Sequence, residues 1–165
     1  MPALEAGVHA PQINLPFPDG RKFSLSQALK KGPVVAAFFK VSCPVCQLAF
    51  PYLERIYKAY RGGGKFTFVG VSQDAAADTE AFNRQFGVTF PVLLEQEGYA
   101  VSNAYRLTNV PTVFMISPSG GIEFSSVSWS KSEMQELSRK LAKLNNSAPA
   151  TIFPAGEQVP EFKPG

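Results

Sequence analysis

Two cysteines three positions apart are the residues whose type and spacing most directly suggest chemistry. They lie in the motif Cys43-Pro44-Val45-Cys46, and the chain contains no third cysteine. Two thiols at this spacing can be oxidised to a disulfide and reduced again, so the motif predicts thiol–disulfide exchange. A single pair also excludes the multiple cross-links of a small secreted disulfide scaffold.

The residues on either side of the motif predict different roles for the two thiols. An apolar run of strand length, residues 33–39, precedes it, and a helical period follows it as far as Tyr60. If Cys43 caps that helix, Pro44 takes the first helical position, and the helix dipole stabilises a thiolate. Thiols at such helix starts have pKa values lowered from about 8.5 to roughly 3.5–7.5. We therefore expect Cys43 to be the nucleophile and Cys46, one turn later, to be the resolving thiol.

Three other interpretations concern the surroundings of the motif. Lys40, at the end of the predicted strand, either tunes the thiolate with its positive charge or points to solvent. Zinc binding needs about four ligands, and the single histidine, His9, lies in an N-terminal loop, so we expect no metal and no cofactor. The remaining alternative is a pair of inert cysteines in a hydrophobic core.

The rest of the chain predicts the elements that must position the thiols. Strands and helices alternate after the motif, which indicates parallel strand pairing. We expect an α/β fold of three layers, a central mixed β-sheet flanked by helices, with an N-terminal β-hairpin. The elements predicted by periodicity and turn signals are a hairpin over 13–23, a strand over 66–71, a helix over 74–86, an extended piece over 90–94, a short helix over 99–105, a strand over 110–116 and a helix from Ser130 to Leu144 with a capping box.

Length and composition place limits on the fold and on the partners. With 165 residues, of which 45% are hydrophobic and 18% charged, the chain fits one redox domain over 1–145 and a Pro-rich tail over 146–165 that is extended or partly disordered. The net charge of +3 is modest and the basic residues are scattered, so nucleic-acid binding is not expected. No apolar run approaches the roughly 20 residues of a membrane span. The first residues contain no leader pattern, which favours the cytoplasm, or an extracytoplasmic site if a leader precedes them.

Several stretches resemble one known family over about 10–144. They are Phe38 to Cys46, Phe50-Pro-Tyr-Leu53, Phe86 to Val92, and Val110-Pro-Thr-Val-Phe-Met-Ile116 followed by Gly120-Gly-Ile122. The chain resembles the thioredoxin-like family that includes the alkyl hydroperoxide reductase and thiol-specific antioxidant proteins, and within it the extracytoplasmic thiol–disulfide oxidoreductases that reduce apocytochromes. The resemblance implies a role in cell redox homeostasis, with a protein or peptide disulfide as substrate and a thiol as electron donor. It also implies that Pro111 is cis beside the dithiol and that Val110 offers its backbone to a substrate peptide.

The motif departs from the family pattern in its acidic residues. Thioredoxins bury an acid where this chain has Ala37, and apocytochrome reductases have a glutamate where it has Ala49. An aromatic residue often precedes the first cysteine, and here that residue is Ser42. Either water or a distant carboxylate then handles the proton of Cys46, with the Glu95 and Glu97 region as a candidate, or turnover is slow.

Two other functions stay open from the sequence. Peroxiredoxins of the same broad family need Pro-x-x-x-Thr-x-x-Cys, but here Phe39 or Ala36 stands in the proline slot and Cys43 or Lys40 in the threonine slot. The strand over 109–114, where such enzymes have an activating arginine, contains none. A thiol peroxidase with antioxidant activity is therefore the second hypothesis. A redox-inert module that binds extended peptides is the third.

Overall fold

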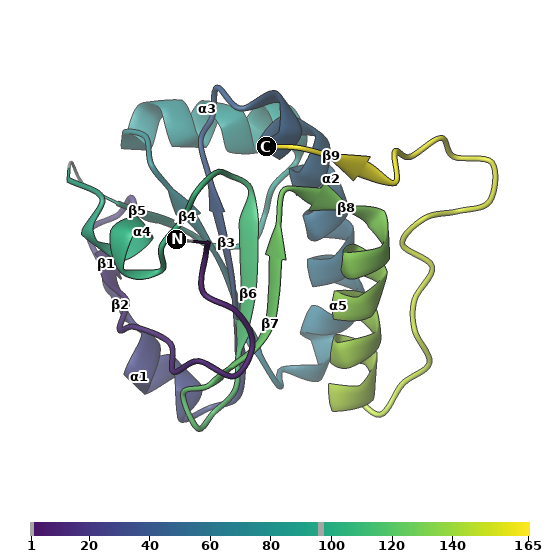
Figure 1. Cartoon of the computed structure of the whole chain (residues 1–165), viewed down its shortest axis with the longest axis horizontal. Coiled ribbons are helices and arrows are strands. Elements are labelled where there is room, and N and C mark those ends of the chain that lie inside the picture. Colours follow the sequence, from purple (N-terminus) through teal and green to yellow (C-terminus); the bar gives the residue numbers. More distant parts are fainter. Residues whose placement is uncertain (1, 96–97) are drawn as a thin grey trace.

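A five-stranded mixed sheet forms the centre of the computed structural model, which describes residues 2–95 and 98–165 (Figure 1). The strand order is β5-β4-β3-β6-β7; the first three strands are parallel, and β6 and β7 are antiparallel to their neighbours. The strands span Val34–Phe39 (β3), Thr67–Ser72 (β4), Val92–Leu94 (β5), Thr112–Ile116 (β6) and Ile122–Val127 (β7). The predicted central mixed sheet is confirmed.

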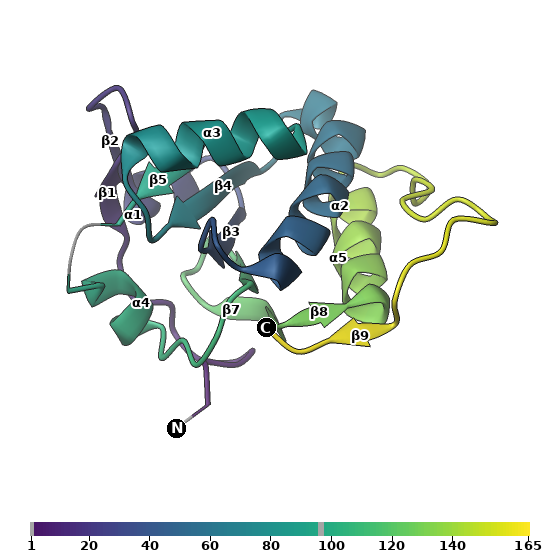
Figure 2. The same cartoon turned by 90° about the horizontal axis from the view of Figure 1, so that it is seen from above.

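Helices cover both faces of this sheet and complete the three layers (Figure 2). One face packs against α2 (Pro44–Tyr60), α3 (Ala76–Phe86) and α5 (Lys131–Leu144). The other face is covered by the N-terminal hairpin and by two short helices. These elements span Asn14–Pro16 (β1), Lys22–Ser24 (β2), Leu25–Leu29 (α1) and Ala100–Ala104 (α4), and a 3-10 turn over Arg61–Gly63 (η1) follows α2.

Strand β3 is apolar throughout because it is covered on both faces. Its side chains alternate between two core clusters, since successive residues of a strand point to opposite faces. Phe39 faces the cluster under α2, and Phe38 faces the cluster under the hairpin. The strand therefore leads directly from the middle of the core into the cysteine motif.

Local signals placed most helix ends correctly. The hydroxyl of Ser130 accepts a hydrogen bond from the backbone N–H of Glu133, as predicted for the cap of α5. The capping box is only half formed, because the Glu133 carboxylate accepts from Ser126 Oγ at 2.8 Å instead of turning back to the cap. The helix predicted from Asp74 begins two residues later, at Ala76, which leaves Asp74 outside the helix.

The Pro-rich tail has turns and little regular structure, and it is attached to the domain by specific contacts. Ile152 is buried, and Arg55 on α2 forms an ion pair with Glu157 at 2.7 Å. Near its end, β9 (Phe162–Lys163) pairs antiparallel with β8 (Trp129–Ser130), a two-stranded ribbon that the sequence did not predict. The division into a domain over 1–145 and a tail stays a prediction.

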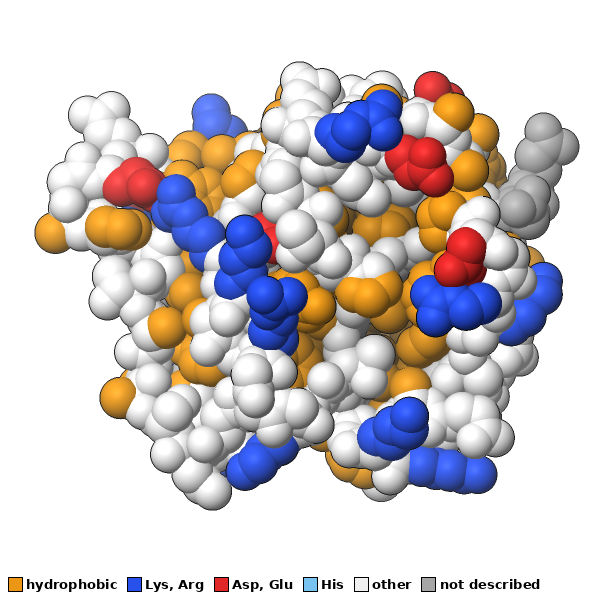
Figure 3. All heavy atoms as spheres, turned by 180° about the vertical axis from the view of Figure 1, so that it is seen from behind, with side chains coloured by type: hydrophobic (Ala, Val, Ile, Leu, Met, Phe, Trp, Pro, Cys, Tyr) orange, Lys and Arg blue, Asp and Glu red, His pale blue; other side chains and the backbone are white. Residues whose placement is uncertain are grey.

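Lys and Arg side chains lie in several separate groups on the face seen in Figure 3, and Asp or Glu side chains lie beside some of these groups. Among the described residues, no helix combines the length and apolarity that a membrane span requires.

Candidate functional site

Cys43 lies at the junction between β3 and α2, as the N-cap of the helix. Its backbone is extended, and Pro44 takes the first helical position, so the chain enters the helix as the sequence predicted. The Sγ atom of Cys43 accepts a hydrogen bond from the backbone N–H of Cys46, with a sulfur–nitrogen distance of 3.2 Å. The backbone N–H of Cys46, which has no acceptor within the helix, therefore points at the Cys43 sulfur and stabilises negative charge there.

Cys46 has a different environment, although it is only one turn away. Cys43 is partly exposed, whereas Cys46 is fully buried in the core cluster beneath α2, and both are free thiols. Burial raises the pKa of the Cys46 thiol well above its usual value, and the neighbouring Cys43 and the negative charge of Asp74 raise it further. A backbone hydrogen bond from Lys40 acts in the opposite direction and lowers the pKa of Cys46. Cys46 is thus protonated at neutral pH and shielded from solvent.

The loop before β6 brings a third element to the site. The Val110–Pro111 peptide bond is cis, as the resemblance implied. The thiol of Cys43 donates a hydrogen bond to the carbonyl oxygen of Val110, at 3.4 Å. Val110 is half-buried and Pro111 is buried beside it. Four of the residues singled out from the sequence, the two cysteines, Val110 and Pro111, therefore lie together.

Lys40 contributes its backbone to the site. Its carbonyl oxygen accepts a hydrogen bond from the N–H of Cys43 at 3.2 Å, while its side chain is exposed. The role of its charge in tuning the thiolate stays a prediction. Ser42, which stands where thioredoxins often have an aromatic residue, is also exposed. The described residues contain no group of three His, Cys, Asp or Glu side chains that could hold a metal ion.

Asp74, which the sequence pattern places in a helix, instead precedes α3 and lies next to the site. Its Oδ2 atom accepts a hydrogen bond from the backbone N–H of Val41, at 2.8 Å, and its own N–H donates to Ser72 Oγ. The carboxylate therefore fixes the loop between β3 and Cys43. A hollow of about 640 Å³, lined in part by Asp74, Glu95 and Tyr99, opens next to it at the ends of β4 and β5. A signal was present in the sequence: a polar residue directly after a buried parallel strand lies at the edge where sites form.

The other predicted acids have structural partners or lie outside the description. Glu95 is buried, and its carboxylate accepts hydrogen bonds from the backbone N–H and the hydroxyl of Ser102. Glu97 lies outside the described residues. Ala37 and Ala49 are buried in the same apolar cluster as Cys46, so the family's usual positions for an acid carry only hydrocarbon here.

Comparison with known proteins places this geometry in a family. A model described as the AhpC/TSA family matches residues 6–125, which is most of the domain that carries the dithiol. The chain belongs to the AhpC/TSA family. The resemblance predicted from the sequence motifs is therefore confirmed.

Curated relatives in this family are disulfide-exchange proteins. Thiol-disulfide oxidoreductase ResA of Bacillus subtilis is 31% identical over 121 residues, which cover 73% of this chain and 66% of that protein. The protein of the same name from Geobacillus thermodenitrificans is 29% identical, with 73% and 68% covered. The chain thus spans about two thirds of the length of these relatives. Both relatives are named for the predicted class of activity, thiol-disulfide oxidoreductase.

Solved structures confirm the thioredoxin-like fold. A thiol:disulfide interchange protein from Bacteroides sp. superposes with a TM-score of 0.73 at 25% identity, covering 88% of this chain and 93% of the other. Peroxidoxin BcpB from Mycobacterium tuberculosis superposes with a TM-score of 0.70 at 21% identity, covering 87% and 97%. Because disulfide-exchange proteins and a peroxidoxin share this fold, the fold alone does not assign the reaction.

Proposed function

We propose that this chain reduces disulfides of proteins or peptides through Cys43, with Cys46 as the resolving thiol. The Cys43 thiolate attacks one sulfur of the substrate disulfide, forming a mixed disulfide and releasing the first substrate thiolate. Cys46 then loses its proton to water and attacks Cys43 Sγ, which breaks the mixed disulfide and releases the second substrate sulfur as a thiolate. Two electrons pass to the substrate, and the chain is left with a Cys43–Cys46 disulfide.

The difference in environment between the two thiols is the observation that carries this assignment. Cys43 is reachable and receives the helix-start N–H of Cys46, so its sulfur is the one that a substrate meets. Cys46 is buried and protonated, which keeps it from attacking external disulfides. Its position one helical turn from Cys43 suits attack on the mixed disulfide once that bond exists.

The neighbouring backbone supports a peptide as the substrate. Val110 and Pro111 lie beside Cys43 on a separate element, so an extended segment bound along Val110 would carry its disulfide to the Cys43 sulfur. Val110 and Pro111 are proposed as substrate-binding residues for this reason. The cycle closes when an external dithiol reduces the Cys43–Cys46 disulfide by the reverse sequence of exchanges.

Parallel assays of insulin reduction and hydrogen peroxide reduction, each driven by a chemical dithiol, test the assignment. We expect insulin reduction above the rate of the dithiol alone, and its loss in Cys43→Ser. Insulin reduction that survives Cys43→Ser would contradict the roles given to the two thiols. Rapid peroxide consumption that persists in Cys43→Ser and disappears in Cys46→Ser would instead establish a peroxidase centred on Cys46.

A further inference from the structure

The end of the tail lies against the same carbonyl group as Cys43. The backbone N–H of Gly165 donates to Ser128 Oγ at 3.0 Å, and the side-chain amide of Asn109 donates to the same oxygen at 2.7 Å. A Cβ atom added to Gly165 would overlap the carbonyl oxygen of Val110. Gly165 therefore covers one side of the oxygen atom that the Cys43 thiol contacts from another side.

The first part of the tail is firmly attached to the domain. Arg55 donates to the carbonyl of Ile152 at 3.0 Å and pairs with Glu157. The indole N–H of Trp129 donates to the carbonyl of Pro160 at 2.7 Å, and the Trp129 ring is buried. This part has little freedom to leave the surface, because its apolar and charged groups both have partners.

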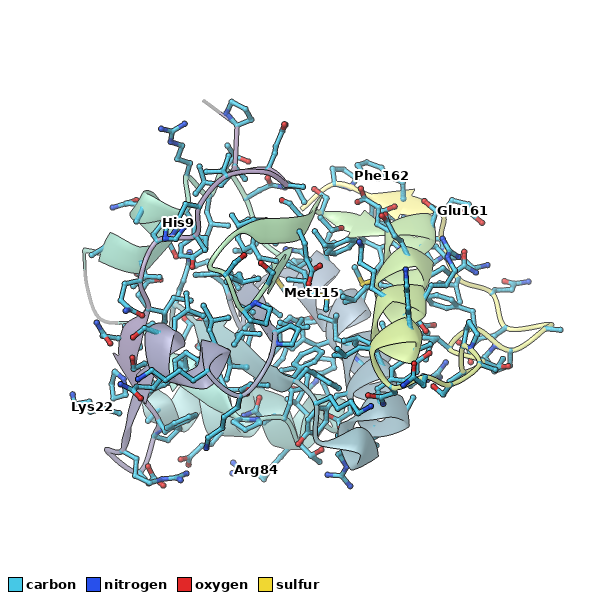
Figure 4. The ribbon with its side chains drawn as sticks, turned by 90° about the horizontal axis from the view of Figure 1, so that it is seen from below. His9, Lys22, Arg84, Met115, Glu161 and Phe162 are labelled. Carbon is cyan, nitrogen blue, oxygen red and sulfur yellow. The ribbon has the colours of Figure 1, made fainter. Side chains whose placement is uncertain are left out.

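Residues 161–165 contribute no buried side chain, so backbone hydrogen bonds and one largely exposed ion pair hold them against the domain. The ribbon between β8 and β9 contains two residue pairs, and the ring of Phe162 is 58% exposed. Glu161 reaches Lys131 at 3.8 Å with a side chain that is 79% exposed, so solvent screens this ion pair. Figure 4 shows Glu161 and Phe162 at the outer edge of the molecule, beside the start of α5.

We propose that residues 161–165 occupy the substrate-binding surface and compete with the peptide substrate for it. Gly165 in this segment lies against Val110, which is the position that the proposed function, on which this inference rests, gives to the substrate. An incoming peptide displaces residues 161–165. The chain up to Pro160 stays bound through Trp129, so the displaced segment swings about Pro160 as its pivot. Residues 161–165 thus occupy the surface in the way that an extended peptide would. A substrate binds only to the fraction of molecules in which this segment has moved away from the surface.

One substitution within the 165-residue chain separates Gly165 from the site. In Gly165→Val, the new side chain cannot fit beside the Val110 carbonyl, so the end of the tail must move away. Removal of residues 161–165 is a second variant with the same expected effect and a different change in the chain. Ala155→Val is the control because it enlarges an exposed side chain of the tail outside residues 161–165.

The test compares two thiol reagents of different size on the reduced protein. A maleimide joined to an extended peptide has to lie along Val110, whereas iodoacetamide needs only access to the sulfur. We expect Gly165→Val and the shortened chain to raise the rate of Cys43 alkylation by the peptide maleimide about 3- to 10-fold, because more molecules have the surface free. The iodoacetamide rate should change less than about twofold, and Ala155→Val should resemble the unaltered chain.

Two outcomes would overturn the competition. Equal peptide-maleimide rates in all four proteins would mean that residues 161–165 do not obstruct the surface, and slower rates in both altered chains would mean that they help to build it. Alkylation requires a thiol but no disulfide exchange, so this result stands even if the chain fails to reduce insulin. Such a failure would contradict the proposed function alone.

Discussion

The Sγ atom of Cys43 lies 3.4 Å from the carbonyl oxygen of Val110, although 67 positions separate the two residues in the chain. This approach follows from the sheet, since β6 runs antiparallel to β3 beside it and therefore begins where β3 ends. The start of α2 and the loop before β6 are thus fixed to one edge of the sheet. Cys43, Cys46 and the backbone of Val110 are therefore positioned by the packed sheet.

Selective alkylation should distinguish the two thiols. With a limiting amount of iodoacetamide at neutral pH, we expect the reduced protein to be modified almost entirely at Cys43. The reason is that Cys46 is buried and its pKa is raised, so little of it is thiolate. Peptide mapping by mass spectrometry measures the ratio. Comparable modification of both sites in folded protein would contradict the burial of Cys46.

Loss of the resolving thiol should trap the intermediate. Cys46→Ser removes the group that attacks Cys43 Sγ, so mixed disulfides with a peptide substrate should accumulate and be visible by mass spectrometry without reductant. Cys43→Ser is the matched control and should form none. If the mixed disulfide resolved at an unchanged rate in Cys46→Ser, another nucleophile would have to act as the resolving group.

Asp74 should shift the pH dependence of the resolving step. Its negative charge raises the pKa of Cys46, so Asp74→Asn lowers that pKa and moves the rise in the rate of resolution toward lower pH. The amide oxygen can still accept from Val41, which preserves the loop. Stopped-flow measurement of the second exchange step across pH gives the profile. Asp78→Asn, on the exposed first turn of α3, is the control and should leave the pH profile unchanged. An unshifted profile in Asp74→Asn would show that the charge of Asp74 does not act on the pKa of Cys46.

Glu54 should matter for stability rather than for exchange. It is buried on α2, and its carboxylate accepts hydrogen bonds from the N–H and hydroxyl of Thr89 and from the N–H of Phe90. Glu54→Ala leaves these donors without a partner, so we expect the free energy of unfolding to fall by about 2–4 kcal/mol. Urea denaturation measures the change. Glu136→Ala, at an exposed position of α5, is the control and should lower the free energy of unfolding by less than about 0.5 kcal/mol. A similarly small loss of stability for Glu54→Ala would show that water replaces the hydrogen bonds of the Glu54 carboxylate.

The dithiol site could be predicted because its signals are local. A buried strand, a proline at the first helical position and a helical apolar period occupy one continuous stretch, and each has a direct structural meaning. Asp74 was missed because its hydrogen bond to Val41 joins segments 33 positions apart, and its place before α3 looked like part of the helix. The ribbon between β8 and β9 was missed because each strand has only two residues, too few to show a period.

The only tryptophan of the sequence lies where the firmly attached and the loosely held parts of the tail meet. Its ring packs against Tyr52 and Phe153, and its N–H is bonded to Pro160. Indole fluorescence responds to hydrogen bonding and to polarity, so the chain carries an intrinsic optical reporter at the pivot of the tail. Departure of the tail on peptide binding could therefore be followed in real time in the unlabelled protein.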